Sequence, residues 1–270
     1  MPKLESSFFL DEKMELEHLN YFNKNGFIVF RNFLSNSYVD MLLAELNRVE
    51  QLLINEGKQK INGVPLKYGK NLAGEKTIQR ICFSSLFSDV FKKLLSDPRL
   101  DLLKEFLGVY EGRINEHEKD GLVINNYIRT PESSFSKMGW HTDSPRDLFL
   151  GKKIMPMLNI GIHLDECLYK NGGLRLLPGT HKQGMFKLLF GKKYFLDNAD
   201  DPKEVGFDIF KGDLTIHCGK VWHRVKESSL YGEESRRRVM YIPMITGKKA
   251  PKNENSKTPL YHKITSKLKI

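Results

Sequence analysis

The chain has few cysteines and no long apolar run. Its 270 residues include only three cysteines, Cys82, Cys167 and Cys218, which are scattered and odd in number. This pattern favours reduced thiols in a cytoplasmic protein over a disulfide framework. No apolar stretch approaches the roughly 20 residues that a membrane-spanning helix needs, and residues 1–5 lack the basic start and apolar run of a secretory signal. We therefore expect a cytoplasmic protein without a membrane span.

Acidic residues are outnumbered. The sequence has 33 Asp and Glu against 43 Lys and Arg, which gives a net charge of +10. Such a charge suits nucleic acid, a membrane surface or an anionic substrate. Much of the excess lies in residues 248–270, and neither zinc-finger spacing nor an aromatic-interleaved basic repeat accompanies it. We expect no nucleic-acid partner, and we interpret residues 248–270 as a solvated basic tail.

Apolar and aromatic residues are sufficient for a sizeable core. Hydrophobic residues make up 40% of the chain and aromatic residues 11%, so wholesale disorder is not expected. Seventeen Phe and ten Tyr favour a protein with much sheet. The length suits one domain of generous size, and we predict a single domain over residues 1–270.

Helical periodicity is concentrated in the first 120 residues. Apolar spacing predicts helices over residues 12–24, 35–54, 85–95 and 98–107. Asn36 or Ser37 is the expected N-cap of the second helix. Residues 57–76 are rich in glycine and lysine with little periodicity, which indicates a loop or a mobile lid.

Strand patterns dominate after Gly121. Turn signals such as Lys211-Gly212-Asp213 separate short apolar runs, and an earlier run follows Gly26. The predicted strands cover residues 26–30, 122–128, 157–164, 173–177, 214–217 and 239–244. Many short antiparallel strands fit a double-sheet jelly roll. The sequence predicts a mostly β fold with flanking α, in which a helical part (about 1–120) braces a β core (about 121–247).

His141-Thr142-Asp143 is the first candidate metal motif. In an extended strand, His-x-Asp places both side chains on the same face, because side chains alternate with a period of two. Two imidazoles and one carboxylate can occupy one face of an octahedral iron(II) ion and leave three positions open. The third ligand must come from elsewhere in the chain. We favour His223, which lies ten residues beyond Asp213.

Other histidines compete for the third position. The remaining candidates are His163, His181 and His217. His217 is the main rival of His223, although a lone strand histidine is more often a hydrogen-bonded structural residue. His181 lies in a Pro-Gly-Thr-His-Lys turn and is not expected to be a ligand.

Longer segments around these motifs resemble a known family. Residues 171–182 read NGGLRLLPGTHK, Gly212-Asp213 precedes His223, and residues 21–35 read YFNKNGFIVFRNFLS. Together with His-Thr-Asp, they closely resemble the phytanoyl-CoA dioxygenase-like family over roughly residues 15–245. Members are iron(II)- and 2-oxoglutarate-dependent oxygenases on a double-stranded β-helix, so the resemblance implies a cupin-like jelly roll.

The resemblance also implies roles for individual residues. His141, Asp143 and His223 become the iron(II) ligands, with 2-oxoglutarate as cosubstrate and O2 as oxidant. The family's 2-oxoglutarate arginine lies on the strand after the distal histidine. In this chain that strand begins with three arginines, residues 236–238. The family pattern selects Arg237, and Arg238 remains an alternative.

Three polar residues are candidates for further cosubstrate contacts. Asn125 and Tyr127 share one face of the strand before the metal motif, so either is placed to hydrogen-bond 2-oxoglutarate. Asn159 is a similar candidate on the next strand. An alternative interpretation of Asn125 is a turn or edge residue.

The implied reaction is hydroxylation of an aliphatic C–H bond, with release of succinate and CO2. Asp143 argues against a halogenase, in which a small residue replaces the carboxylate. We expect a small or lipid-like substrate, and the positive charge favours an anionic one, met by Lys67, Lys70, Lys76 or Arg80. Two alternatives stay open, namely a non-catalytic small-molecule-binding barrel and a zinc hydrolase with the same three ligands.

Overall fold

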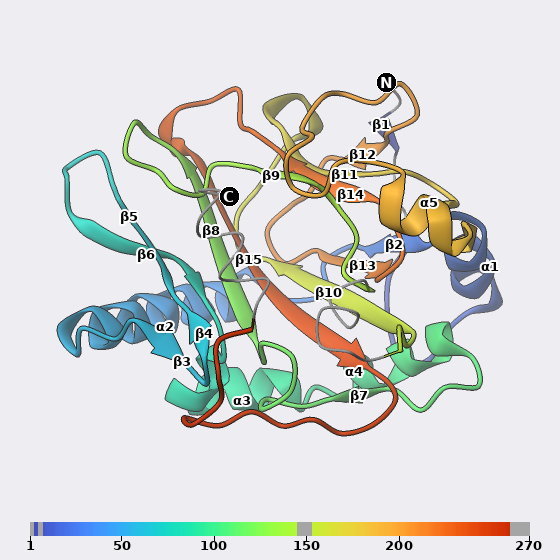
Figure 1. Ribbon diagram of the computed structural model, residues 1–270, viewed down its shortest axis with the longest axis horizontal. Coiled ribbons are helices and arrows are strands. Elements are labelled where there is room, and N and C mark those ends of the chain that lie inside the picture. The colour runs from blue at the N-terminus through green and yellow to red at the C-terminus, as the bar shows by residue number, and fades with distance from the viewer. Residues whose placement is uncertain (1–2, 5–7, 145–152, 260–270) are drawn as a thin grey trace.

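Two antiparallel sheets face each other in the computed structural model, which describes residues 3–4, 8–144 and 153–259 (Figure 1). Among these residues the larger sheet has eight strands. In pairing order, seven of them are β2 (Phe27–Phe30), β13 (Leu214–Cys218), β10 (Met157–His163), β15 (Gly232–Ile245), β8 (Val123–Arg129), β6 (Lys76–Ile81) and β5 (Lys67–Lys70). The eighth strand, β7 (Arg113–Ile114), also pairs with β15.

The smaller sheet has three strands and carries much of the candidate site. Its order is β11 (Gly173–Leu176), β14 (His223–Lys226) and β9 (Met138–His141). Two short pairs lie outside both sheets: β1 (Lys3–Leu4) with β12 (Gly206–Phe207), and β3 (Lys60–Ile61) with β4 (Val64–Pro65). The predicted mostly β jelly roll with flanking helices is confirmed.

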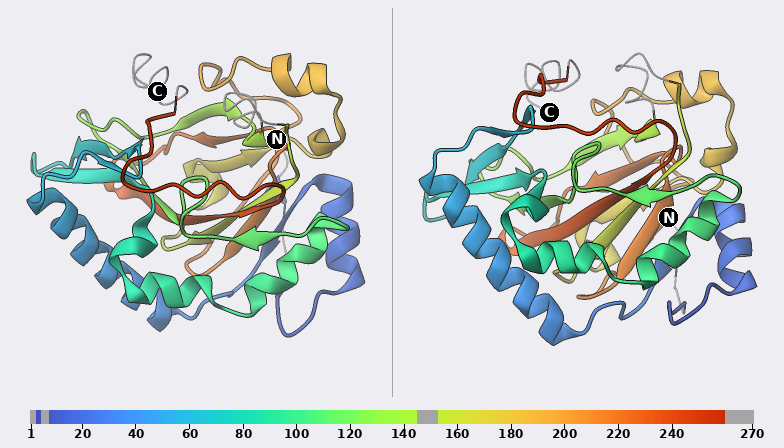
Figure 2. Two further views of the ribbon diagram at one scale, coloured as in Figure 1. Left: turned by 60° about the horizontal axis from the view of Figure 1, so that its bottom comes forward. Right: turned by 90° about the horizontal axis from the view of Figure 1, so that it is seen from below.

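The helices within residues 16–107 cover the face of the larger sheet that is turned away from the smaller sheet, whereas the helix of residues 185–190 lies on the other side, near the smaller sheet (Figure 2). The α-helices are α1 (Leu16–Asn25), α2 (Asn36–Asn55), α3 (Asp89–Leu95), α4 (Arg99–Leu102) and α5 (Met185–Phe190). The 3-10 turns are η1 (Ser84–Phe87), η2 (Leu103–Leu107), η4 (Tyr169–Asn171) and η5 (Thr180–Lys182). In the described part of the chain, none of the helices combines the length and the apolar character that crossing a bilayer requires.

The long helix α2 is fixed by one cap and one apolar stripe. The Ser35 hydroxyl accepts a hydrogen bond from the Tyr38 backbone N–H at 3.2 Å, so Ser35 is the N-cap. The predicted caps, Asn36 and Ser37, were wrong by one or two residues. The buried stripe follows helical spacing and consists of Val39, Leu42, Leu46, Val49 and Leu53. Burial of each leucine contributes about 1.5–3 kcal/mol, which anchors the helix on the sheet.

Strand β15 crosses the middle of the larger sheet and presents two unlike faces. Met240, Ile242 and Met244 are fully buried in the core beneath the helices. Arg237 and Tyr241 point the opposite way, toward the smaller sheet, because side chains alternate along a strand. The period-two pattern therefore separates the packing face from the face that lines the candidate site.

Residues 57–76, predicted as a loop or mobile lid, contain strands instead. β3 and β4 form a small hairpin, and β5 turns at Asn71–Gly74 to pair with β6. β6 then pairs with β8, which joins the hairpin to the larger sheet. The apolar anchors are few but effective, since Ile78 is 2% exposed and Tyr68 packs against the same core. Tyr68 and Ile78 lie among lysines and other polar residues, so this segment has no continuous apolar pattern from which strands could be predicted.

Other strands differ from prediction in extent. The predicted strand 239–244 is only the second half of β15, which begins at Gly232. β9 and β14 were not predicted, because neither MGWH nor HRVK contains a continuous apolar run. Since β2, β5 and β6 belong to the larger sheet, residues 1–120 supply strands as well as helices. The single domain over residues 1–270 stays a prediction.

The described part of the basic tail packs on the fold. The Lys252 backbone N–H donates to the His117 carbonyl at 2.7 Å, and the Ala250 N–H donates to the Glu118 carboxylate at 2.6 Å. The Lys252 ammonium also lies 3.5 Å from Asp120. The backbone of this segment is therefore held on the fold, while Lys248, Lys249 and Lys257 are exposed, as expected for a solvated basic segment; residues 260–270 lie outside the described part.

Candidate functional site

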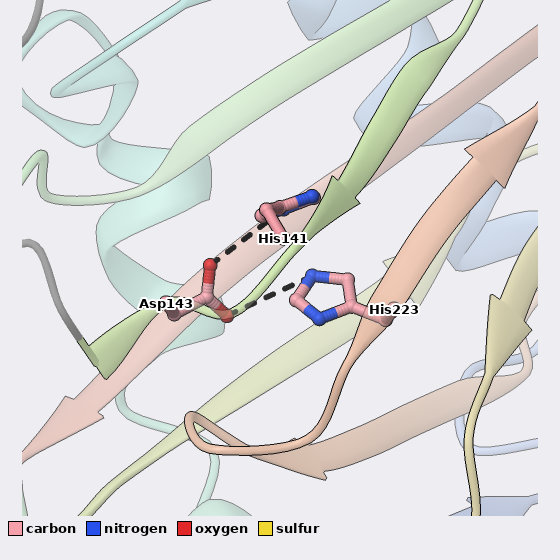
Figure 3. Close-up of side chains that lie close together, drawn as sticks. All are labelled: His141, Asp143 and His223. Carbon is pink, nitrogen blue, oxygen red and sulfur yellow. Dashed lines mark ion pairs between the residues drawn. The ribbon is translucent and has the colours of Figure 1, made fainter. Parts of the chain in front are cut away.

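His141, Asp143 and His223 come together between the two sheets (Figure 3). His141 ends β9, His223 begins β14, and the two are direct partners across these strands. One ligand atom of each of the three residues lies within 4.8 Å of the others. The Nε2 atoms of His141 and His223 are each 3.9 Å from a carboxylate oxygen of Asp143. The three predicted metal-binding side chains are therefore neighbours in the fold.

Asp143 reaches this cluster from a turn. β9 ends at His141, so the expectation that His141 and Asp143 share one face of a strand was wrong. The backbone N–H groups of Asp143 and Ser144 both donate to the Gly219 carbonyl at 2.9 Å. Gly219 lies in the loop that leads to His223, so this loop fixes the carboxylate beside the distal histidine.

Both imidazoles are oriented by carbonyls of their own chain segments. His141 Nδ1 lies 2.8 Å from the Gly139 carbonyl oxygen, and His223 Nδ1 lies 3.0 Å from that of Val221. A carbonyl oxygen can only accept, so each Nδ1 carries the proton and donates it. Each Nε2 then presents its lone pair to the cluster, which is the tautomer that a metal ligand needs.

The Asp143 carboxylate has two further polar partners. Its Oδ2 accepts a hydrogen bond from Asn159 Nδ2 at 3.1 Å and lies 3.2 Å from His217 Nε2. His217 is also close to His223, with ring centroids 4.2 Å apart. His217 thus lies beside the cluster of His141, Asp143 and His223 but is not part of it. Its contact with Asp143 was not predicted from the sequence.

The other two candidate histidines lie elsewhere. His163 Nε2 contacts the Thr215 hydroxyl at 3.0 Å on the inner face of the larger sheet. His181 Nε2 contacts the Asn23 carbonyl at 3.2 Å, within the turn where the sequence placed it. Neither joins the cluster of His141, Asp143 and His223.

Burial and charge set the protonation of the cluster. Burial lowers the pKa of His141 and lowers that of His223 well below its usual value, because the cation loses its hydration. Burial opposes ionisation of Asp143, but His223, His217 and His141 outweigh it and hold the carboxyl pKa below its usual range. At neutral pH the site therefore offers two neutral imidazoles and one carboxylate.

The three consecutive arginines separate clearly by partner. Arg236 forms a paired contact with Glu233, at 2.7 and 2.6 Å, and Arg238 forms one with Asp165, at 2.8 and 2.7 Å. Arg237 is 6% exposed on the opposite face of β15.

The Arg237 guanidinium is held in place by two carbonyls. It donates to the Lys226 carbonyl at 2.9 Å and to the Ser136 carbonyl at 3.0 Å. Its buried Nε–H has no hydrogen-bond partner among the described residues, and within that part of the chain no carboxylate lies in ion-pair contact with it. A buried guanidinium with an unpartnered N–H and no neighbouring carboxylate is suited to binding an anion.

Asn125 and Tyr127 lie on the same face of the sheet as Arg237. Tyr127 is the direct partner of Arg237 between β8 and β15, and the guanidinium carbon is 5.7 Å from its ring centroid. Asn125 Nδ2 donates to the Tyr127 hydroxyl at 3.0 Å. The buried Asn125 Oδ1 has no partner within the described residues. These predicted contact residues therefore border the same space as Arg237.

The aromatic residues Tyr194 and Phe195, which cover one side of the site, were not identified from the sequence. The Phe195 ring stacks on His141, with centroids 4.8 Å apart. Gly139 permits this approach, because a Cβ there would collide with the Phe195 carbonyl. The Tyr194 hydroxyl contacts Thr142 at 2.6 Å and so ties the same segment to the metal motif. The contact spans more than fifty residues, and only the fold reveals it.

Comparison with known families identifies the group to which this chain belongs. The family model of phytanoyl-CoA dioxygenase (PhyH) matches residues 22–229. The chain belongs to this family. The match covers every residue of the cluster and of the strands that carry it, and ends shortly before Arg237. The family resemblance inferred from the sequence motifs is thus confirmed.

Curated relatives of this PhyH-family chain are named as dioxygenases. It is 29% identical over 158 residues to the "Probable alpha-ketoglutarate-dependent hypophosphite dioxygenase" of Stutzerimonas stutzeri, covering 58% of this chain and 50% of the relative. It is 23% identical over 175 residues to the ectoine dioxygenase of Bordetella parapertussis, covering 64% and 51%. The chain thus spans about half the length of the curated relatives it matches.

Solved structures share the fold at low identity. EctD from S. alaskensis with bound Fe has a TM-score of 0.62 and 18% identity, covering 91% of this chain and 83% of that one. EvdO2 from Micromonospora carbonacea var. aurantiaca, complexed with 2-oxoglutarate, has a TM-score of 0.61 and 15% identity, covering 90% and 96%. These similarities establish the fold of this PhyH-family member.

The residues present fit a bound iron(II) ion and a 2-oxoacid. Two inward-facing Nε2 atoms and one carboxylate form the donor set that leaves half of an octahedron open. The unpartnered Nε–H of Arg237 fits one oxygen of a second, distal carboxylate. The geometry can therefore hold a metal and a dicarboxylate together.

Proposed function

We propose that the protein is an iron(II)- and 2-oxoglutarate-dependent dioxygenase with His141, Asp143 and His223 as its iron ligands. The observation that carries this proposal is the convergence of two oriented imidazoles and a carboxylate near a buried arginine that has no acidic partner within the described chain. A structural ion-pair network would have paired that arginine with a carboxylate, as it does Arg236 and Arg238.

We assign Arg237 to the distal carboxylate of 2-oxoglutarate. Its position is set by the Lys226 and Ser136 carbonyls, so little side-chain freedom is lost when the anion binds. Asn125 and Tyr127 are proposed to hydrogen-bond the same cosubstrate from the neighbouring strand. Asn159 also remains a proposed contact, although one of its amide N–H groups already donates to Asp143.

Bound iron(II) would supply activation of O2, coupled to conversion of 2-oxoglutarate into succinate and CO2 and to hydroxylation of an aliphatic C–H bond of a small-molecule substrate. The chain's own residues would orient and shield these reactants. The Phe195 ring covers one side of His141, and the Tyr194–Thr142 contact holds this cover in place. Exclusion of water on that side strengthens the electrostatic contacts within the site.

The direct test of this proposal is oxygen-dependent release of succinate. Protein loaded with iron(II) should convert 2-oxoglutarate slowly even without a substrate, and Asp143→Ala should abolish the conversion. A matched control is Asp165→Ala, which removes a carboxylate from the far side of β15 and should retain turnover in the protein that folds. Succinate release that persists without added iron, or in Asp143→Ala, would overturn the assignment.

A zinc hydrolase with the same ligands is the main competing function. Zinc also accepts two histidines and one carboxylate, but a hydrolase has no evident use for an anion-binding Arg237. Zinc-dependent hydrolysis with no 2-oxoglutarate turnover in the iron-loaded protein would favour that alternative.

A further inference from the structure

Lys67 lies in a row of paired residues beside the candidate cosubstrate site. Lys67 on β5 is the partner of Arg80 on β6, and Arg80 is the partner of Asn125 on β8. Directly paired residues of antiparallel strands point to the same face of the sheet. That face also carries Tyr127 on β8 and Arg237 on β15, which are direct partners across these two strands. The Lys67 side chain thus extends from the edge of the sheet toward the site.

Aromatic rings connect the Lys67 ammonium to the site. Nζ lies 4.5 Å from the centroid of the Phe135 ring, within range of a cation–π contact. Phe135 stacks on Tyr127, with ring centroids 4.5 Å apart and an interplanar angle of 21°. Tyr127 in turn borders Arg237. The ammonium is therefore one aromatic layer away from the residues proposed to hold 2-oxoglutarate.

Within the described residues, Lys67 differs from its charged neighbours in having no acidic partner. Lys70 on the same strand pairs with Glu132 at 2.8 Å, and Arg80 pairs with Asp120 at 2.8 Å. Across the described residues, no carboxylate lies within ion-pair distance of Lys67. Burial, with a smaller contribution from Arg80, lowers the pKa of Lys67 to about 8. A partly buried, uncompensated cation costs free energy unless a ligand neutralises it.

The charges of the proposed complex leave Lys67 unneutralised. Iron(II) contributes two positive charges and Arg237 one, and these are balanced by the Asp143 carboxylate and the two carboxylates of 2-oxoglutarate. Arg80 is balanced by Asp120. Within the described residues, Lys67 therefore remains as one positive charge that neither a side chain nor the cosubstrate cancels, which matches a substrate carrying an anionic group.

We propose that Lys67 binds an oxyanion group of the primary substrate, of the carboxylate, phosphonate or phosphinate class. This proposal rests on the function proposed for the site. The ammonium supplies a compact charge that accepts any of these geometries, and Phe135 shields one side of the contact. The substrate class is thus a small anionic molecule whose charged group lies near β5 and whose reacting carbon faces the metal.

The test is oxyanion binding measured by calorimetry, with acetate, phosphite and methylphosphonate as probes. Wild-type protein should bind at least one of them, both as apoprotein and when loaded anaerobically with iron(II) and 2-oxoglutarate. Lys67→Met should weaken that binding by about tenfold or more, because a charge-assisted contact is lost. Lys67→Arg should restore most of it. Lys70→Met is the matched control on the same strand and should bind as the wild type does.

Two results would overturn the proposal. One is that none of the three probes binds wild-type protein. The other is that Lys67→Met binds them as tightly as wild type does; if 2-oxoglutarate binding is weakened in that variant, Lys67 is instead a cosubstrate residue. Failure of the iron and 2-oxoglutarate assignment is distinguishable, since it would abolish succinate release while oxyanion binding to the apoprotein persisted.

Discussion

The two faces of the larger sheet carry side chains with different roles, although the same strands supply both. On β15, Met240, Ile242 and Met244 face the helices and are fully buried, each at 0% exposure. The residues that face the smaller sheet include Arg237 with an unpartnered Nε–H. Arg238, on the helix side of β15, has a carboxylate partner, whereas Arg237, on the site side, has none within the described residues. Stability and ligand binding are therefore separated by the two-residue period of the strand.

The contrast extends to the arginines of β15. Arg238 faces the outside of the barrel, where Asp165 neutralises it through two hydrogen bonds. Arg237, one residue away, donates to two carbonyls and lies near an aromatic ring, and it has no carboxylate partner within the described residues. Neighbouring residues of identical type thus have opposite roles, and substitutions on the two faces should have separable effects.

The largest expected effect follows from removing a ligand on the site face. His223→Ala should lower iron(II) affinity by more than about 100-fold, since loss of outer partners alone costs 10–100-fold. His217→Ala, which removes only a partner of Asp143, should lower it by about tenfold. Metal titration of both apoproteins measures the difference. Equal losses would show that His217 is itself a ligand.

The next effect compares the two arginines. Arg237→Ala should raise the dissociation constant of 2-oxoglutarate by about 100-fold, because a charge-assisted contact with a carboxylate is removed. Arg238→Ala should leave that constant nearly unchanged but lower the free energy of unfolding by about 1–3 kcal/mol, because Asp165 loses its charged partner and keeps only the backbone N–H of residue 238 from it. Cosubstrate titration and urea denaturation measure the two quantities. The reverse ranking would transfer the anion site to Arg238.

A substitution on the helix face should affect stability alone. Ile242→Ala should lower the free energy of unfolding by about 2–5 kcal/mol, because it leaves a cavity in a fully buried core. The iron(II) affinity of the folded protein should be unchanged. Denaturation followed by metal titration below the transition checks both statements. A large loss of iron affinity in the folded state would show that the two faces are coupled.

The smallest effect concerns the cap of α2, far from the site face. Ser35→Ala should cost about 1 kcal/mol, because the Tyr38 N–H loses its acceptor. Ser37→Ala is the matched control and should be nearly neutral, since the Ser37 hydroxyl is exposed and, within the described residues, hydrogen-bonds that of Ser35 alone. Thermal denaturation of both variants distinguishes Ser35 from Ser37 as the cap.

Much of the fold was predictable where one pattern dominates a segment. The apolar stripe of α2 and the apolar runs of β2, β8, β10 and β13 were each located to within a few residues. The hairpin of β5 and β6 was not, because its lysines mask the pairing with β8. The short strands β9 and β14 depend on pairing with each other, which no local pattern records.

The site was predictable in its residue types and less so in its contacts. The motif and family pattern identified the cluster and selected Arg237. That Asp143 lies in a turn held by Gly219, that His217 contacts its carboxylate, and that Phe195 covers His141 all depend on segments distant in sequence. Such contacts are set by how the loops pack, and a single sequence carries no signal for them.

The most direct measurement is an anaerobic titration of the apoprotein with iron(II) and 2-oxoglutarate, in which the visible charge-transfer band of the chelate is followed. We expect the band to appear in the wild type and in Arg238→Ala, and to require a far higher cosubstrate concentration in Arg237→Ala. A metal-bound protein that develops no band at saturating 2-oxoglutarate would contradict the central claim.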